Sequence, residues 1–226
     1  MLPIIDADWI RYGAGFAAEK RSIKVIHTPT GDEHTFKNRT EFYGRGKARD
    51  GGWLGEINKS RTSPLIASEY EILDVQTPEP IDHVLFTVKR MFDSVLNRFD
   101  TKQYKAFYGE GDSFRVDRST VIKYKGNREG TIKPMQIDDI TEYMVKKYKM
   151  QKCVGLEADD WCIIEAIRNQ NSVVVSHDKD SNGCAVNVWN PTKPDEPMMD
   201  CRGFGELYIK TNAKGQKSVK GRGRKF

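Results

Sequence analysis

The chain has 226 residues, of which 38% are hydrophobic and 31% are charged, as in a soluble globular protein with one principal domain. No apolar run is long enough to cross a membrane, and the amino-terminal "MLPII" is interrupted at Asp6, too early for a secretory signal. We therefore expect a protein that stays where it is made and has no membrane partner.

The four cysteines lie far apart, with no C-x-x-C pair and no histidine at the spacing of a zinc ligand. They are Cys153, Cys162, Cys184 and Cys201. We expect reduced thiols in a cytosol and no structural zinc.

Short β-prone runs alternate with helical patterns along the chain. Residues 2–5 and 173–175 are apolar without alternation, which is typical of strands buried on both faces of a parallel sheet, and "YKAFYG" predicts a further strand. Apolar residues spaced by three and four predict helices over 85–99 and 137–148. The alternation predicts an α/β layer fold with right-handed crossovers within residues 1–206.

Two segments depart from this pattern. Residues 30–64 are glycine-rich and basic, and we expect an insertion there, either a substrate-facing loop or hairpin or a solvated loop. Residues 207–226 hold seven of the 37 basic residues and none of the 32 acidic ones, so the rest of the chain has a net charge of −2. We expect this basic tail to be disordered without a partner and either to bind nucleic acid or only to increase solubility.

Acidic residues follow three of the predicted strands. "PIIDAD" ends in Asp6 and Asp8, "YKAFYGEGD" ends in Asp112, and "VVVSHDKD" contains Asp178 and Asp180. The carboxyl ends of parallel strands meet at one edge of a sheet, and binding sites form outside that edge. We therefore expect these five carboxylates to lie close together.

A fourth acidic segment is "GLEADDWCIIEAI", which predicts a helix with Glu157, Asp159 and Asp160 in its first turn. A lone acidic residue there is commonly a helix cap, and Asp8 has the same ordinary explanation. Caps do not explain the whole set, because carboxylates within ~4–6 Å repel one another unless cations neutralise them. All-oxygen ligands favour Mg²⁺ or Mn²⁺, and two such ions about 4 Å apart commonly serve phosphodiester cleavage.

The segment "VIKYKGNRE", between two of the acidic motifs, contains Tyr124, Lys125 and Arg128. The cations can hold phosphate and the tyrosine can stack on a terminal base, although a solvated basic loop is the ordinary alternative. No serine or cysteine has triad partners, and His177 is interpreted as a structural neighbour of Asp178, so we expect no protein nucleophile.

The motifs "IDADW", "YKGNR", "GLEADD" and "SHDKD" occur in the order found in the 5′-nuclease superfamily, which the chain resembles over about residues 4–180. The superfamily comprises flap endonucleases, the 5′-nuclease domain of bacterial DNA polymerase I and bacteriophage 5′–3′ exonucleases, with the phage branch most similar. The resemblance implies a PIN-like three-layer α/β nuclease fold, a central mostly parallel sheet flanked by helices, and two Mg²⁺ or Mn²⁺ ions. It also implies a cytoplasmic location, in an infected bacterial host if a phage encodes the protein.

Carried over motif by motif, the resemblance implies a role for each residue. The first metal cluster would consist of Asp6, Asp112, Glu157, Asp159 and Asp160. Asp178 would lie near both ions and Asp180 at the second. Lys125 and Arg128 would stabilise the scissile phosphate, and Tyr124 would stack near the 5′ end. Further substrate contacts are assigned to the basic residues Arg115, Lys220, Arg222 and Arg224.

The sequence departs from the superfamily in two ways. Only residues 129–156 separate Arg128 from Glu157, so the arch over the active site, about residues 125–140, is expected to be short. After "DKD" the superfamily continues into a helix-hairpin-helix segment that grips duplex DNA and completes the second metal site, whereas this sequence reaches only a basic stretch resembling its lead-in. The sequence is then a fragment, one half of a split nuclease completed by a separate polypeptide, or a nuclease with one well-formed metal site.

The leading hypothesis is a Mg²⁺-dependent 5′–3′ exonuclease or flap endonuclease that acts on 5′ ends or flaps of DNA, or on RNA/DNA hybrids. One alternative is a catalytically impaired nucleic-acid-binding module, which would bind DNA in a salt-sensitive way without cleaving it. The other is a PIN-type ribonuclease, which would prefer RNA to flap DNA.

Overall fold

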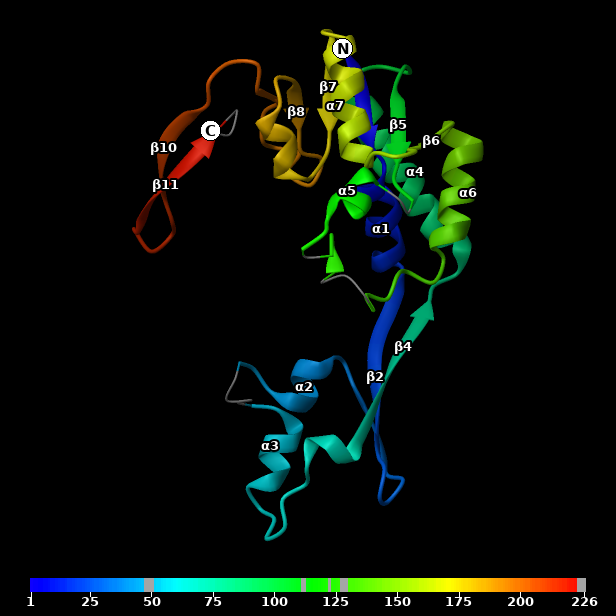
Figure 1. The fold of residues 1–226 in the computed structure, drawn as a ribbon, viewed down its shortest axis with the longest axis vertical. Helices are drawn as coiled ribbons and strands as arrows, with labels where there is room; N and C mark the ends of the chain where they lie inside the picture. The colour runs from blue at the N-terminus through cyan, green and yellow to red at the C-terminus, as the bar shows by residue number, and fades with distance from the viewer. Residues whose placement is uncertain (47–50, 111–112, 122, 127–129, 223–226) are drawn as a thin grey trace. The chain divides into compact units, whose positions relative to one another are not determined.

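The computed structural model describes residues 1–46, 51–110, 113–121, 123–126 and 130–222. The chain divides into two compact units, one formed by Met1–Ala17 with Asp82–Phe226 and the other by Ala18–Ile81. We call them the core unit and the inserted unit, and Figure 1 shows both along the chain. No helix in the described ranges is long and apolar enough to cross a membrane.

The central sheet of the core unit has, among the described residues, six strands in the order β6-β5-β1-β7-β8-β9. Their bounds are β1 Leu2–Asp6, β5 Lys105–Tyr108, β6 Gln151–Lys152, β7 Ser172–Val175, β8 Asn187–Trp189 and β9 Met199–Asp200. All neighbours are parallel except β8 and β9. The apolar runs in β1 and β7 are buried because helices cover both faces, so the predicted mostly parallel sheet is confirmed.

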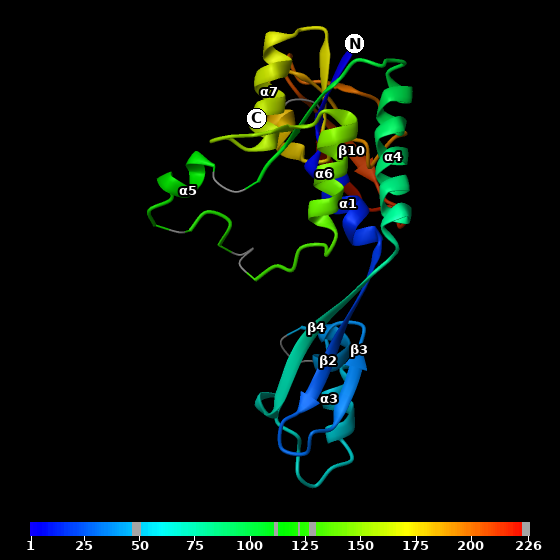
Figure 2. The same cartoon turned by 90° about the vertical axis from the view of Figure 1, so that its right-hand side faces the viewer.

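Helices lie on both faces of this sheet (Figures 1 and 2). Their bounds are α1 Asp8–Ala17, α4 Ile81–Arg98, α5 Phe114–Arg118, α6 Ile137–Tyr148, α7 Ala158–Arg168 and the 3₁₀ helix η3 Lys179–Gly183. On one face, Cys162 and Ala166 of α7 pack against Ile4 and Val174 of the sheet. Helices α4 and α6 lie on the other face (Figure 2). The predicted arrangement of a sheet flanked by helices is therefore confirmed.

The helices α4 and α6 meet at Phe92 and Tyr148, two of the apolar positions that predicted them. Val84, Val88, Phe92 and Val95 of α4 are fully buried. The ring of Phe92 stacks on that of Tyr148 with 4.0 Å between centroids. Both predicted helices are confirmed, since α4 and α6 begin and end within a few residues of the expected ranges.

The inserted unit is a small folded domain and not a loop. It consists of β2 Glu19–His27, β3 Glu33–Phe36, α2 Arg39–Tyr43, α3 Trp53–Asn58, the 3₁₀ helix η1 Ala67–Glu69 and β4 Tyr70–Pro78. An antiparallel sheet in the order β3-β2-β4 packs on a core that includes Val25, Phe36, Phe42 and Leu54. The insertion expected over residues 30–64 is therefore wrong in extent, because the strands that complete its core lie outside that range.

The basic tail also differs from expectation. Strands β10 (Glu206–Thr211) and β11 (Lys217–Arg222) form an antiparallel hairpin, so the expected disorder is wrong for these residues. The Asn212 side chain accepts hydrogen bonds from the backbone N–H of Lys214 and Gln216, both at 2.9 Å. Gly215 has φ 77°, a conformation that favours glycine. These contacts close the turn between the two strands.

Candidate active site

A cleft of about 1060 Å³ opens in the core unit where β1, β5 and β7 end. The strand order reverses at β1, with β5 on one side and β7 on the other, and such reversals are where α/β sheets form sites. The predicted site residues that line this cleft are Asp6, Arg115, Tyr124, Lys125, Glu157, Asp159, Asp160, Asp178 and Asp180.

Asp6 is the last residue of β1 and is only 7% exposed. Its Oδ1 accepts the backbone N–H of Asp8 at 3.2 Å, and its Oδ2 accepts the hydroxyl of Ser176 at 3.1 Å. Burial, together with the nearby negative charge of Asp8, raises the pKa of Asp6 to about 7. A cation in the cleft would favour the ionised form of this carboxyl.

The first turn of α7 supplies three more carboxylates from one short segment. Glu157 is the N-cap residue, and its backbone N–H donates to Asp160 Oδ2 at 3.2 Å. Asp159 Oδ1 accepts the backbone N–H of Asp160 at 2.9 Å. Burial and the charge of Asp160 raise the pKa of Asp159. The ordinary capping role of these residues is therefore present, and the Glu157 carbonyl also accepts the backbone N–H of Trp161 at 3.2 Å.

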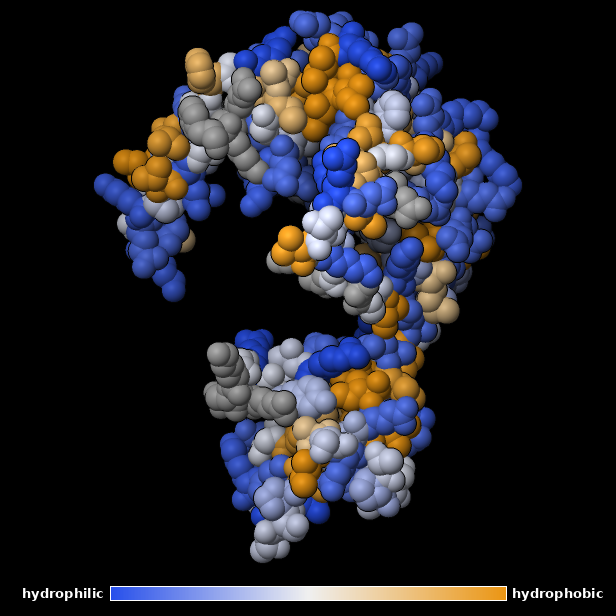
Figure 3. Space-filling model, in the orientation of Figure 1, coloured by the Kyte–Doolittle hydropathy of each residue, from blue (hydrophilic) through white to orange (hydrophobic). Residues whose placement is uncertain are grey.

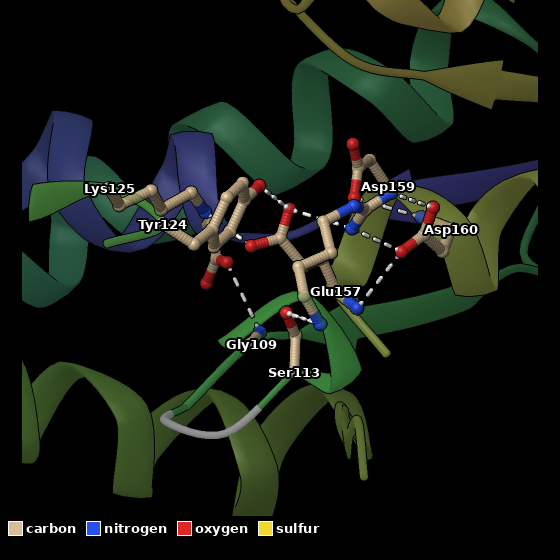
Figure 4. Close-up of polar contacts among 9 residues, drawn as sticks. Gly109, Ser113, Tyr124, Lys125, Glu157, Asp159 and Asp160 are labelled. Carbon is tan, nitrogen blue, oxygen red and sulfur yellow. Dashed lines mark hydrogen bonds and ion pairs between the residues drawn. The ribbon is translucent and has the colours of Figure 1, made fainter. Parts of the chain in front are cut away.

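Side-chain cations meet these carboxylates within the cleft (Figure 4). Arg115 donates from Nη1 to Asp160 Oδ2 at 2.6 Å and from Nη2 to Asp160 Oδ1 at 2.7 Å, and Nη1 also reaches Glu157 Oε2 at 3.0 Å. The ammonium of Lys125 pairs with Glu157 Oε1, and the Tyr124 hydroxyl donates to Glu157 Oε2 at 2.9 Å. The hydrogen bonds to Asp160 raise the pKa of Arg115. The mutual repulsion of Glu157 and Asp160 is thus offset by neighbouring cations.

The short helix α5 positions Arg115 opposite α7. The Ser113 side chain caps this helix by accepting the N–H of Arg115 at 3.3 Å. The backbone N–H of Phe114 donates to the carbonyl of Gly155, just before α7, at 2.9 Å. Two segments far apart in the sequence are therefore joined next to the acidic turn.

Lys125 adopts an uncommon backbone conformation, with φ 55°. A non-glycine residue in this left-handed region costs roughly 1–2 kcal/mol. The residue lies in a turn that the backbone N–H of Gly126 closes on the carbonyl of Lys123 at 3.0 Å. Within the predicted arch, residues 127–129 lie outside the described residues, and α6 already begins at Ile137.

Asp178 and Asp180 lie beyond the end of β7 and are exposed. Asp178 caps η3, where its Oδ1 accepts the backbone N–H of Asp180 at 2.9 Å. The backbone N–H of Asp178 donates to Ser176 Oγ at 3.1 Å. Ser176, which the sequence analysis did not select, therefore contacts both Asp6 and the segment that carries Asp178.

Asp8, one of the five carboxylates expected to lie close together, also lines the cleft, and its partner Arg11 was not predicted as a site residue. Arg11 is 3% exposed and donates from Nη1 to Asp8 Oδ1 at 2.7 Å and to the carbonyl of Gly109 at 3.0 Å. Its Nε donates to Thr141 Oγ1 at 2.9 Å, and the backbone N–H of Gly109 donates to Asp8 Oδ2 at 3.1 Å. This network ties α1, the end of β5 and α6 together beneath the cleft. The i, i+3 spacing of Asp8 and Arg11 on a predicted helix is the sequence signal that indicates the pair.

Aromatic side chains from α1 also line the cleft and were not predicted as site residues. They are Trp9, Tyr12 and Phe16. The rings of Tyr12 and Phe16 lie 6.0 Å apart, and Phe16 is exposed. The cleft therefore combines an acidic side with an apolar one.

The donor set can be tested for its fit to a divalent metal. Carboxylate oxygens are the hard ligands that Mg²⁺ and Mn²⁺ prefer, and Asp6 lies close enough to Asp159 for their charges to interact. The chemistry of the residues therefore fits such an ion. In the present conformation Glu157 and Asp160 face Arg115 and Lys125, and within the described ranges no three Asp, Glu, His or Cys side chains form a ligand cluster.

The remaining predicted residues lie elsewhere. Lys220 and Arg222 belong to β11 of the hairpin. Asp112, Arg128 and Arg224 lie outside the described residues. The structure therefore says nothing of a carboxylate from the end of "YGEGD" or of the second cation of "YKGNR".

Comparison of the chain with protein-family models, with curated proteins and with solved structures finds no match. The assignment of function therefore depends on the residues of the cleft and on the motifs in the sequence.

Proposed function

We propose that this chain is a metal-dependent 5′ nuclease that hydrolyses phosphodiester bonds near 5′ ends or flaps of DNA, with a PIN-like core. One observation carries the proposal: carboxylates from β1, from α7 and from the segment after β7 line the same cleft as Tyr124 and Lys125. Neither a helix cap nor a solvated loop requires acidic residues from such distant segments to share a cleft with an aromatic and a cation.

The residues that would hold the metal are those with carboxylates in the cleft. Asp6, Glu157, Asp159 and Asp160 are proposed for the first site, with Asp112 from the resemblance. Asp178 and Asp180 are proposed for the second. Bound Mg²⁺ or Mn²⁺ supplies an activated water and neutralises charge at the phosphate.

The other residues of the cleft fit the handling of a polyanionic substrate. Lys125 and Arg115 carry the positive charge that a phosphodiester needs, and both reach Glu157. The ring of Tyr124 lies under these cations, with Lys125 Nζ 5.3 Å from its centroid. We propose that Lys125, with Arg128, holds the scissile phosphate and that Tyr124 stacks on the terminal base.

The test is cleavage of a 5′-labelled flap DNA in the presence of Mg²⁺ or Mn²⁺. Asp160→Asn and Asp178→Asn are expected to abolish cleavage and to leave DNA binding in EDTA unchanged or tighter, because each removes a negative charge. Glu165→Gln is a matched control, since Glu165 lies on α7 but pairs with Lys105 and Arg168 outside the cleft. Cleavage at the parental rate by both aspartate variants would disprove the site.

A second candidate is a nucleic-acid-binding module that does not cleave. The observation in its favour is that Arg115 and Lys125 already neutralise Glu157 and Asp160. It predicts salt-sensitive DNA binding and no cleavage at any Mg²⁺ or Mn²⁺ concentration. The same assay with an RNA substrate tests the ribonuclease alternative, which predicts faster cleavage of RNA than of flap DNA.

A further inference from the structure

The acidic cleft raises the question of what attracts a nucleic acid to this protein. Apart from residues 207–226 the chain has a net charge of −2, and carboxylates outnumber cations in the lining of the cleft. The seven basic residues of 207–226 account for the whole positive excess. Five of the seven lie in β10, β11 and the turn between them, so this hairpin is the part of the described chain best suited to hold a polyanion.

The strand register sorts the hairpin side chains onto two faces. Tyr208 pairs with Lys220, and Lys210 pairs with Ser218, so these four residues share one face, which we call the basic face. The register also pairs Glu206 with Arg222 at the end of the strands.

The opposite face of the hairpin is apolar. Leu207, Ile209 and Val219 are 69%, 67% and 66% exposed, and the register places Lys217 on this face opposite Thr211. Figure 3 shows hydrophobic and hydrophilic surface side by side over the hairpin. One face of the hairpin is therefore basic and the other is mainly apolar.

We infer that the basic face of the hairpin, formed by Tyr208, Lys210, Ser218 and Lys220, binds the phosphate backbone of duplex DNA. The inference deepens the proposed function, since it rests on a nucleic-acid substrate.

The cations of the basic face have the arrangement that such a ligand requires. Lys210 and Lys220 are diagonal neighbours across the two strands, and among the described residues neither forms an ion pair. A row of phosphates brings negative charge to both ammonium groups at once and releases counterions from the DNA.

The neutral residues of the basic face and the shape of the hairpin fit the same ligand. The hydroxyl of Tyr208 is a donor of the kind that contacts phosphate oxygens, whereas that of Ser218 donates to the carbonyl of Lys210 at 3.4 Å. A two-stranded ribbon is also narrow enough to enter the major groove of a duplex. An acidic protein surface would satisfy the charges but not this combination of donors and shape.

The experiment measures binding of a fluorescein-labelled DNA duplex by anisotropy in EDTA, over a series of KCl concentrations. The double variant Lys210→Gln/Lys220→Gln is expected to raise Kd roughly tenfold at low salt and to reduce the slope of log K against log salt by about two. Circular dichroism of each variant checks that the fold is retained.

Two controls separate the basic face from net charge alone. Lys89→Gln/Lys146→Gln removes the same charge from α4 and α6, and Lys217→Gln removes one charge from the apolar face of the hairpin. Both are expected to change Kd less than twofold. An unchanged Kd and slope in the basic-face variant, or a parent that does not bind the duplex, overturns the inference. Because EDTA prevents metal-dependent cleavage, loss of nuclease activity bears only on the proposed function.

Discussion

The hydroxyl of Ser176 donates to Asp6 Oδ2 at 3.1 Å, across 170 positions of sequence. Ser176 Oγ also accepts the backbone N–H of Asp178 at 3.1 Å, and Ser176 is only 1% exposed. One buried hydroxyl therefore fixes the carboxylate at the end of β1 and the segment that follows β7. If Asp6 binds a metal, Ser176 orients this ligand without touching the ion.

Ser176→Ala is expected to lower Mg²⁺-dependent cleavage roughly 10- to 100-fold, the usual effect of removing a hydrogen-bond partner of a metal ligand. The loss should appear as a higher Mg²⁺ concentration for half-maximal activity. Ser176→Thr keeps the hydroxyl and should recover most of the parental response. Equal Mg²⁺ dependence in the alanine variant and the parent would show that Ser176 has no positioning role.

Arg115 forms a bidentate pair with Asp160 and reaches Glu157 in the absence of metal. Arg115→Ala leaves those carboxylates to repel each other, so the metal-free variant should lose on the order of 1 kcal/mol of stability. Mg²⁺ should then stabilise the variant more than the parent, because the ion no longer competes with the guanidinium. Thermal unfolding with and without Mg²⁺ measures both effects.

Arg202 provides a matched control for this experiment. It forms a similar bidentate contact with Asp200, with its Nη2 2.6 Å from Oδ2 and its Nε 2.8 Å from Oδ1, and neither residue lines the cleft. Arg202→Ala should leave the Mg²⁺-induced rise in Tm unchanged. The interpretation of Arg115 is wrong if both variants respond to Mg²⁺ like the parent.

The pKa of Asp6 makes the stability of the metal-free protein depend on pH. Burial raises this pKa from 3.8 to about 7, so the folded state holds the proton more tightly than the unfolded state. The contribution of protonated Asp6 to the free energy of unfolding is fully present below pH 3.8. It is lost as pH rises to about 7, and the loss amounts to at most about 4 kcal/mol. The free energy of unfolding can be measured with urea in EDTA at several pH values between 3.8 and 7. It should fall more steeply with rising pH in the parent than in Asp6→Asn. Parallel curves would contradict the raised pKa of Asp6.

Arg11 should be more important for stability than an ordinary ion pair, because it is almost fully buried and bonds to Asp8, Gly109 and Thr141. Arg11→Met is expected to lower the free energy of unfolding by about 3 kcal/mol, since it leaves Asp8 without its cation. Asp8→Asn/Arg11→Met should be less destabilised than the sum of the single variants. Urea denaturation of the three variants tests this, and strict additivity would show that the two residues act independently.

The core of the fold could be predicted because its signals are local. The apolar runs of β1 and β7 are long enough to indicate strands buried on both faces, and the spacing of Val88, Phe92 and Val95 indicates one face of a helix. The strand-end rule then brings Asp6 and Asp178 to one edge of the sheet. That reasoning needs no knowledge of side-chain contacts.

The inserted unit and the hairpin could not be predicted in the same way. Strand β2 begins with "EKRS", whose charged side chains conceal the strand pattern, and only Ile23, Val25 and His27 in it are buried. Their partners Phe42 and Leu54 lie on short helices, in a glycine-rich stretch whose composition predicts a loop. The apolar residues of the hairpin are exposed and do not belong to a core. The basic residues around them therefore dominate the composition, which predicts a charged tail.

The contacts within the cleft also depend on the folded chain. Arg115 meets Asp160 because α5 is joined to the loop before α7 through Phe114 and Gly155. The sequence does not indicate that Phe114 and Gly155 are in contact. Without that contact, Arg115 cannot be distinguished from the other basic residues of the chain. Ser176 reads as an ordinary polar residue between a strand and an acidic motif.

The position of Lys125 has a consequence for any cation that enters the cleft. Its φ of 55° lies in a turn that the backbone N–H of Gly126 closes on the carbonyl of Lys123 at 3.0 Å, and its ammonium pairs with Glu157. An incoming ion that binds Glu157 would displace this ammonium. Occupation of the acidic side of the cleft and release of a cation for a substrate phosphate would then be one event.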